Sequence, residues 1–326
     1  MARTRFAAIL PLFLVVAAYC PAAAQQAGAS ACDVPVVAVQ LDPQTHALDL
    51  VTDFTATDFT ATQGGHGVHV NSATIDTTPK RIVLVFDASK RVDKTQWNVQ
   101  FQLAGTLLAN SRSGDNFSIF LTPGTPLPFV SSDESRAALQ RLMAARPKVA
   151  EKRNPIYDSL FAASKIFGAP RFGDSIVLIG FREDAKSKNK PDYVLGALIQ
   201  GGIRLHTIDI ADSGDLPYRS EFTLPGAIAV ADPDEAQLFA MSVKSGGASR
   251  TVRRDRSLKD DPAFQHRLQV LYEGITRPYR LTIQLDGTAT PRKLEVSAGR
   301  KRGAGATIIL SYPKVLVGCP NASAGP

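Results

Sequence analysis

The spacing of apolar residues divides the chain into a central part and two ends. Between residues 80 and 247, short apolar runs alternate with stretches in which apolar residues recur at helical spacing. Such runs are typical of strands buried on both faces, and their alternation with helices predicts an α/β fold with a doubly wound, mostly parallel sheet. The expected strands are 82–86, 117–121, 175–179 and 203–210, and the expected helices are 94–109, 134–145, 156–167, 193–200 and 234–244.

The two ends alternate apolar and polar residues with the period of a half-buried strand. Residues 34–76 show this pattern, with glycines at 64, 65 and 67 marking turns, and it returns after a helical candidate at 262–273. We expect both ends to form one small β module beside the central domain. The predicted divisions are a leader (1–24), an N-terminal β segment (25–78), the α/β domain (79–248), and a basic loop with a C-terminal β segment (249–326).

The first residues have the pattern of a secretory signal peptide. Arg3 and Arg5 precede an apolar stretch at 7–18, and three alanines before Gln25 offer a cleavage site. A lipoprotein would use Cys20, but the bulky Tyr19 before it disfavours that alternative. No later segment is an uninterrupted apolar span. The sequence therefore predicts export, to the periplasm or the cell exterior.

Export makes the remaining cysteines candidates for a disulfide. Cys32 and Cys319 stay if Cys20 leaves with the leader, and an even number of cysteines in an oxidising compartment favours pairing. A Cys32–Cys319 bridge would join the first and last parts of the mature chain. Two independent thiols are the alternative.

The net charge is +7, and much of the excess lies in two late clusters at 250–259 and 292–302. No aromatic residues interleave with these charges, and Asp255 interrupts the first cluster, which argues against a nucleic-acid surface. A solvated loop, or weak contact with an anionic envelope component, explains the charge better.

Candidate chemistry begins at the end of the first central strand. Asp87 and Ser89 follow the apolar run 82–86, and the carboxyl ends of parallel strands are where open α/β folds place their ligands. Several further motifs occur in order along the chain: Leu50–Phe59, Asn154-Pro-Ile-Tyr157-Asp158-Ser-Leu160, Ser175–Asp184, Ser245-Gly246-Gly247, Tyr279-Arg-Leu-Thr and Lys293-Leu294-Glu-Val296. Taken together, these motifs resemble the acidobacterial von Willebrand factor A-related family of exported proteins, over nearly the whole mature chain.

The resemblance implies a metal-ion-dependent adhesion site built from an Asp-x-Ser-x-Ser loop, a threonine and a distal aspartate. This chain keeps only Asp87 and Ser89, because Arg91, Asn154 and Phe181 stand at the other positions. Mg²⁺ prefers a near-octahedral set of oxygens, so we expect no metal here, although weak Mg²⁺ binding by Asp87 and Ser89 stays open. Arg91 or Lys90 would instead neutralise Asp87 and offer a positive group to an acidic partner. The simpler alternative is that Asp87 and Ser89 only satisfy backbone amides.

Other candidates have simpler explanations. His66 and His69 lie in a glycine-rich turn, and Glu183-Asp184 precedes three lysines, so exposed turns and a solvated loop account for them. Asp158 suits a helix start electrostatically, and Trp97 fits a core. No catalytic motif of the common hydrolase or nucleotide-binding types occurs.

The sequence therefore predicts a non-enzymatic interaction protein of the adhesion type, which binds a protein or envelope ligand through loops at the carboxyl edge of its sheet. The loop residues expected to contact the ligand are Asp87, Ser89, Arg91, Asn154 and Phe181. An envelope hydrolase with a spatially assembled site, and a structural component that pairs through an exposed strand edge, remain alternatives.

Overall fold

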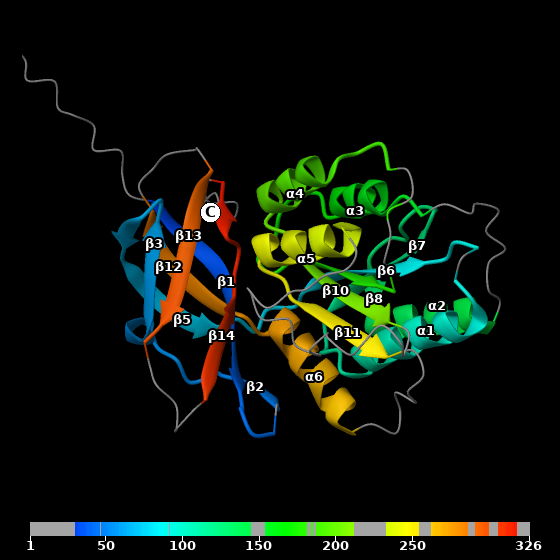
Figure 1. Ribbon diagram of the computed structural model, residues 1–326, viewed down its shortest axis with the longest axis horizontal. Coiled ribbons are helices and arrows are strands. Elements are labelled where there is room, and N and C mark those ends of the chain that lie inside the picture. Colours follow the sequence, from blue (N-terminus) through cyan, green and yellow to red (C-terminus); the bar gives the residue numbers. More distant parts are fainter. Residues whose placement is uncertain are drawn as a thin grey trace, which may run out of the picture.

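The computed structural model describes residues 30–45, 47–90, 92–144, 154–180, 184, 187–211, 233–253, 262–285, 291–299 and 306–317. The chain forms two parts that lie side by side: a β module made of both ends of the described chain and a larger α/β part (Figure 1).

The α/β part is built on a six-stranded sheet in the order β11-β10-β9-β6-β7-β8. All neighbours pair in parallel except β8, which runs antiparallel to β7 at one edge. The strands are β6 (Arg81–Asp87), β7 (Asn116–Thr122), β8 (Val130–Ser131), β9 (Ser175–Ile179), β10 (Arg204–Ala211) and β11 (Ser249–Arg253). The four strands expected from sequence are confirmed to within a residue at each end, whereas β8 and β11 were not expected.

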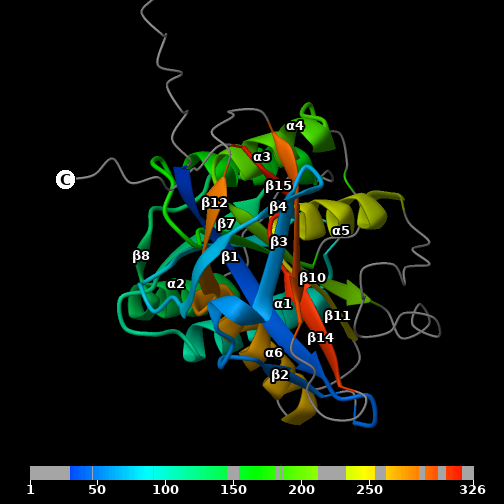
Figure 2. The same ribbon diagram turned by 90° about the vertical axis from the view of Figure 1, so that its left-hand side faces the viewer.

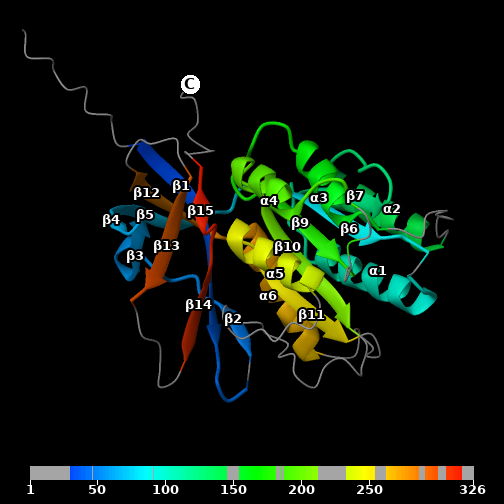
Figure 3. The same cartoon turned by 45° about the horizontal axis from the view of Figure 1, so that its top comes forward.

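Helices cover both faces of this sheet, which explains the continuous apolar runs. Along β6, Ile82, Leu84 and Phe86 enter one core with α1, α2 and α6, while Val83 and Val85 enter another with α3, α4 and α5. Figure 3 shows α4 and α5 in front of the strands. The helices are α1 (Lys94–Ala109), α2 (Ser132–Ala144), α3 (Ile156–Lys165), α4 (Pro191–Gln200), α5 (Pro233–Ser245) and α6 (Pro262–Thr276).

The expected domain boundary at residue 248 lies too early. β11 extends the parallel sheet beyond β10, and α6 packs against α1 on one face of it, so the α/β part continues to Thr276. This strand was not predicted, because the positively charged residues after 249 are typical of a loop. Arg250 and Arg253 belong to β11 instead of a loop, and residues 254–260 lie outside the described chain.

The β module joins the two ends of the chain, as the alternating patterns predict. One sheet has the order β14-β1-β12-β5 with β2 paired to β1, and the other has the order β15-β13-β3-β4 (Figure 2). Tyr279, Leu281 and Ile283 face Val34 and Val36 in a core shared by both sheets. The strands are β1 (Ser30–Leu41), β2 (Leu48–Leu50), β3 (Phe59–Gln63, after the 3₁₀ turn η1, Ala56–Asp58), β4 (His66–Val68), β5 (Val70–Ile75), β12 (Tyr279–Leu285), β13 (Arg292–Ala298), β14 (Thr307–Ser311) and β15 (Val315–Leu316).

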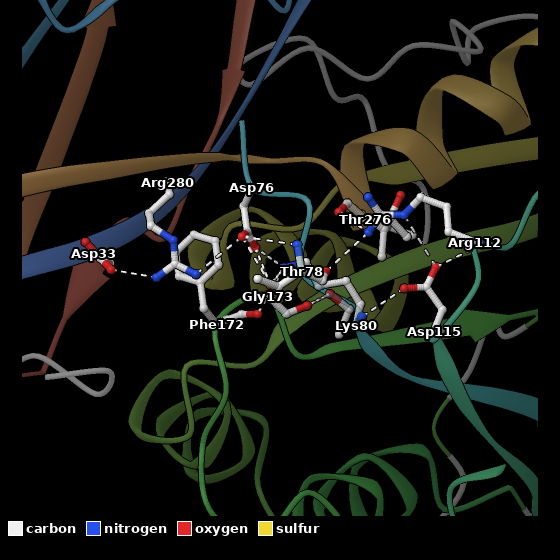
Figure 4. A network of polar contacts seen from close by, with 12 residues as sticks. Asp33, Asp76, Thr78, Lys80, Arg112, Asp115, Phe172, Gly173, Thr276 and Arg280 are labelled. Atoms are coloured by element: carbon white, nitrogen blue, oxygen red, sulfur yellow. Dashed lines mark hydrogen bonds and ion pairs between the residues drawn. The ribbon is translucent and has the colours of Figure 1, made fainter. Parts of the chain in front are cut away.

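A chain of charged groups joins the module to the amino-terminal edge of the central sheet (Figure 4). Arg280 on β12 donates to Asp33 on β1 (2.6 Å) and to Asp76 after β5 (3.4 Å). Asp76 in turn pairs with the ammonium of Lys80, whose side chain is fully buried just before β6. The Lys80 ammonium also donates to the Thr78 hydroxyl (3.0 Å).

The same edge of the sheet is closed by α6. Asp115, just before β7, accepts the Tyr272 hydroxyl of α6 (2.7 Å) and the backbone N–H of Lys80 (2.8 Å). Arg204, fully buried at the start of β10, donates to the carbonyls of Gly274 (3.2 Å) and Ile275 (2.5 Å) in the last turn of α6. A guanidinium at a helix carboxyl end satisfies carbonyls that have no partner within the helix.

Among the described residues, none of the helices has the length and apolar character needed to cross a membrane. The expected leader, including Cys20, lies outside the described residues. Cys32 is buried on β1, but Cys319 also lies outside them, so the bridge stays a prediction. His66 and His69 are exposed, His66 in the edge strand β4, and the described residues contain no group of three metal-ligating side chains.

Candidate functional site

The carboxyl ends of β6 and β7 bring the first polar residues of the candidate site together. Asp87 and Thr122 are the last residues of these strands and lie opposite each other in register. The two segments stay hydrogen-bonded one residue beyond β6, because the N–H of Ala88 donates to the Thr122 carbonyl (2.9 Å). The edge therefore starts with a carboxylate on one strand and a hydroxyl on its neighbour, both largely buried.

The Asp87 carboxylate binds its own loop. Its Oδ1 accepts the backbone N–H of Ser89 (2.8 Å), an arrangement in which a short acidic side chain stabilises the turn after a strand. This contact agrees with the simpler of the two sequence-based interpretations. Ser89, which belongs to this turn, is completely buried.

Asn154, expected at the threonine position of the adhesion site, does reach this edge. It is 3% exposed, and its Oδ1 accepts the Thr122 hydroxyl (2.7 Å). Its Nδ2 is buried without a hydrogen-bond partner among the described residues. The amide group thus has its oxygen occupied and its nitrogen buried without a partner among the described residues, and leaving such a donor unpaired is unfavourable.

Two glutamines of α1 brace the edge from one face. The side chain of Gln100 accepts from the backbone N–H of Asp87 (3.0 Å) and donates to its carbonyl (3.1 Å), much as a neighbouring strand would. Gln96 donates to the carbonyl of Gly180 (3.1 Å), the residue that follows β9. Gly180 has a φ of +85°, and an added Cβ would lie 2.8 Å from the Gln100 side chain, so only glycine fits.

The loop between β9 and α4 is fastened to the start of α3. Asp158 accepts the backbone N–H groups of Lys188 (3.0 Å) and Asn189 (2.8 Å), and Asp184 accepts the Ser187 hydroxyl (2.5 Å). Asp158 therefore holds the loop before α4 in addition to placing a favourable charge at the start of α3. Asp184 is half-buried and structural, which corrects the expectation of a merely solvated loop.

These residues make a poor magnesium site. In the part of the chain that the structure describes, the ends of β6 and β7 supply one carboxylate, Asp87, and two hydroxyls, while the Asn154 oxygen is engaged by Thr122. Mg²⁺ calls for six oxygens in near-octahedral order and is usually held by one or two carboxylates with substrate phosphates or water. The donor set therefore does not fit the ion that the sequence resemblance implies.

Two of the expected site residues, Arg91 and Phe181, lie outside the described residues, so their roles stay predictions. Sequence reasoning missed Thr122, Gln96 and Gln100. The apolar run of β7 was ended one residue too early, before Thr122. A glutamine on the buried face of a helix, as Gln100 is, was the available signal for a polar brace.

No protein-family model matches the chain, and no curated protein matches it. Solved structures similar to it include a von Willebrand factor type A protein from Catenulispora acidiphila (12% identity, 90% of this chain and 75% of that chain, TM-score 0.46). An aerotolerance-related membrane protein from Bacteroides fragilis (15%, 60% and 98%, TM-score 0.41) and the SpRpn10 VWA domain (8%, 58% and 98%, TM-score 0.39) are also similar. With TM-scores below 0.5, these likenesses add nothing to the fold assignment, which rests on the strand order and helices above.

Proposed function

We propose that this chain is an exported, non-catalytic binding protein whose carboxyl sheet edge holds a protein or envelope ligand without a metal ion. The observation that carries this proposal is the Asn154 amide, buried at that edge with its donor hydrogens unpartnered among the described residues. A carbonyl or carboxylate oxygen of a partner would satisfy it. The predicted leader supports export.

The arrangement around Asp87 supports binding without metal. The Asp87 carboxylate stabilises its turn through the Ser89 amide. The Gln100 side chain makes the two hydrogen bonds to the Asp87 backbone that a neighbouring strand would make. These contacts support a loop that keeps its shape without an ion. Arg91, predicted to follow this turn, would add a positive charge and favour an acidic ligand.

An exposed aromatic residue beside the edge suits a protein ligand. Tyr193 in the first turn of α4 is 59% exposed and its ring lies 5.2 Å from that of Phe161 on α3. Tyrosine is enriched in protein interfaces because its ring buries a large area while its hydroxyl stays hydrated.

Affinity capture with the full chain tests the proposal. Wild type, Asn154→Leu, and Asp87→Ala with Arg91→Ala would be cross-linked to an envelope extract after circular dichroism has shown each variant to be folded. The matched control is Thr60→Ala with Glu295→Ala, which changes exposed residues of the β module. A partner that is captured by wild type and the control but lost from both edge variants supports the proposal.

Two outcomes would overturn it. Capture that the edge variants leave unchanged and the β-module control abolishes would favour assembly through the module. Turnover of an ester, peptide or glycan substrate that Asp87→Ala abolishes would favour a hydrolase.

A further inference from the structure

A cavity of about 80 Å³ lies where the β module meets the α/β part, away from the carboxyl edge of the sheet. Strands β1 and β14 of the module, strands β10 and β11 of the sheet, and helices α5 and α6 all contribute to its wall. Most of the wall is apolar, with Val37, Val39, Phe239, Val270, Leu271 and Ile309 among its residues. We call it the His206 cavity, after the one histidine among its described lining residues.

His206 brings an unpartnered donor to this wall. The residue is 2% exposed, and its Nδ1 accepts the backbone N–H of Ala248 (3.1 Å). Since a neutral imidazole carries one hydrogen, accepting at Nδ1 places that hydrogen on Nε2. The buried Nε2 has no hydrogen-bond partner among the described residues.

The ring stays neutral because of its surroundings. Burial, followed by the nearby charges of Arg204 and Arg250, holds the pKa of His206 well below its usual value. A protonated ring could not accept from Ala248, so neutrality agrees with the hydrogen-bond geometry. The neutral ring therefore contributes one N–H donor to a mostly apolar wall, whose other polar side chains are those of Ser249, Arg250, Ser311 and Lys314.

Charge at the cavity favours an anion. The charged residues among its described lining are Arg250 and Lys314, both cations, and no carboxylate lines it in the same part of the chain. A carboxylate oxygen would accept from Nε2 of His206, and a charge-assisted hydrogen bond of this kind is stronger than a neutral one. An alkyl chain would then fill the apolar space.

The volume limits the length of the alkyl chain. An apolar cavity of about 150 Å³ accommodates benzene, so a cavity about half that size accommodates a few carbon atoms. We propose that the His206 cavity binds a short-chain aliphatic monocarboxylate of three to five carbons, with its carboxylate on His206 and its chain against Val39 and Val270.

Nuclear magnetic resonance titration of the full chain, with its histidines labelled by ¹⁵N, tests this site. The probes are sodium acetate, propionate, butyrate, valerate and hexanoate, with butanol and butylamine as uncharged and cationic matches for butyrate. We expect the Nε2 resonance of His206 to move, with affinity rising about fourfold for each added methylene until the cavity is full. Hexanoate should bind more weakly than valerate, and butanol and butylamine at least tenfold more weakly than butyrate.

Two variants keep the test interpretable. His206→Phe removes the donor together with the reporter resonance, so butyrate binding to the variants is measured by isothermal titration calorimetry. His206→Phe should weaken butyrate binding at least tenfold, whereas His69→Phe, at an exposed histidine of the β module, should leave it unchanged. Should His206→Phe fail to fold, Val270→Phe fills the cavity and should abolish binding by its bulk. No movement of the His206 resonance with any carboxylate at tens of millimolar would overturn the proposal, and equal affinity for butanol would overturn its carboxylate part.

Discussion

The two edges of the central sheet differ in how their polar groups are used. At the amino-terminal edge, Lys80, Asp115 and Arg204 are almost wholly buried and bonded to the β module or to α6. At the carboxyl edge, Asp87 and Asn154 are also buried; Asp87 accepts from Ser89, Asn154 accepts from Thr122, and the Asn154 Nδ2 has no hydrogen-bond partner among the described residues. One edge is closed by packing, and the other is the edge that we propose to hold a partner.

The difference follows from what packs against each edge of the sheet. Buried charges are tolerated where partners and hydrogen bonds surround them, and removing one partner leaves the other uncompensated. The amino-terminal edge therefore contributes to stability, whereas under the proposed function the edge with the unpartnered Asn154 nitrogen contributes to binding. Each of the following predictions tests this division, starting with the largest expected effect.

Asp76→Ala should destabilise the protein most. It removes the partner of the Lys80 ammonium, whose side chain is fully buried, and also an acceptor of Arg280. Breaking a buried pair in this way costs about 3–5 kcal/mol of unfolding free energy, which urea denaturation measures. The double variant Asp76→Leu with Lys80→Met is the control, because an apolar pair of similar volume should recover most of the loss. A loss in Asp76→Ala below about 1 kcal/mol would show that this edge is not what stabilises the junction.

Tyr272→Phe should have the next largest effect. The hydroxyl of Tyr272 donates to Asp115 at 2.7 Å, and hydrogen bonds to charged groups contribute about 1.5–3 kcal/mol. Burial, aided by the Asp115 carboxylate, raises the pKa of Tyr272, so the phenol keeps its proton at neutral pH. The control is Tyr193→Phe on the exposed face of α4, which should change the unfolding free energy by less than about 0.5 kcal/mol. Equal losses in the two variants would contradict the proposed closure by α6.

His206 on β10 should make the free energy of unfolding depend on pH. Its folded-state pKa lies well below the ordinary value of 6.5, so below about pH 6.5 the unfolded chain binds a proton that the folded chain does not. Stability should therefore fall as pH falls, by up to about 1.4 kcal/mol per pH unit from this residue. His206→Gln removes the titration, and urea denaturation from about pH 7 to about pH 5 should show a shallower slope than in wild type. Parallel slopes would mean that the ring becomes protonated without loss of the fold.

The parts of this fold that sequence predicted are those with local signals. The continuous apolar runs of β6 and β9 require burial on both faces, and the helical spacing from Lys94 to Ala109 gave the bounds of α1. β11 was missed because Arg250 and Arg253 lie in the strand, and charged residues there resemble a loop. This segment is a strand because it pairs with β10, and that pairing is a contact of the folded chain that the local sequence does not specify.

The candidate site was predicted only in part for the same reason. Asp87 and Ser89 were found because they end an apolar run, and Asn154 was found through a family resemblance. Thr122 completes the site only because β7 aligns it with Asp87, and Asp115 meets Tyr272 across a separation of 157 residues. Contacts of this kind follow from the assembled fold, and no local pattern in the sequence specifies them.

The smallest expected effect is the response of the carboxyl edge to Mg²⁺. An ion bound with a dissociation constant equal to its concentration would stabilise the folded state by about 0.4 kcal/mol, or roughly 1 °C in Tm for a chain of this size. Because the ends of β6 and β7 offer one carboxylate among the described residues and the Asn154 oxygen is engaged by Thr122, millimolar Mg²⁺ should shift the wild-type Tm by less than about 1 °C. The matched variant, Arg91→Ser with Asn154→Thr and Phe181→Asp, restores the residues of the adhesion motif and should show a larger shift. A wild-type shift of several degrees that Asp87→Ala abolishes would mean that this edge holds a metal after all, and that its loop is not complete on its own.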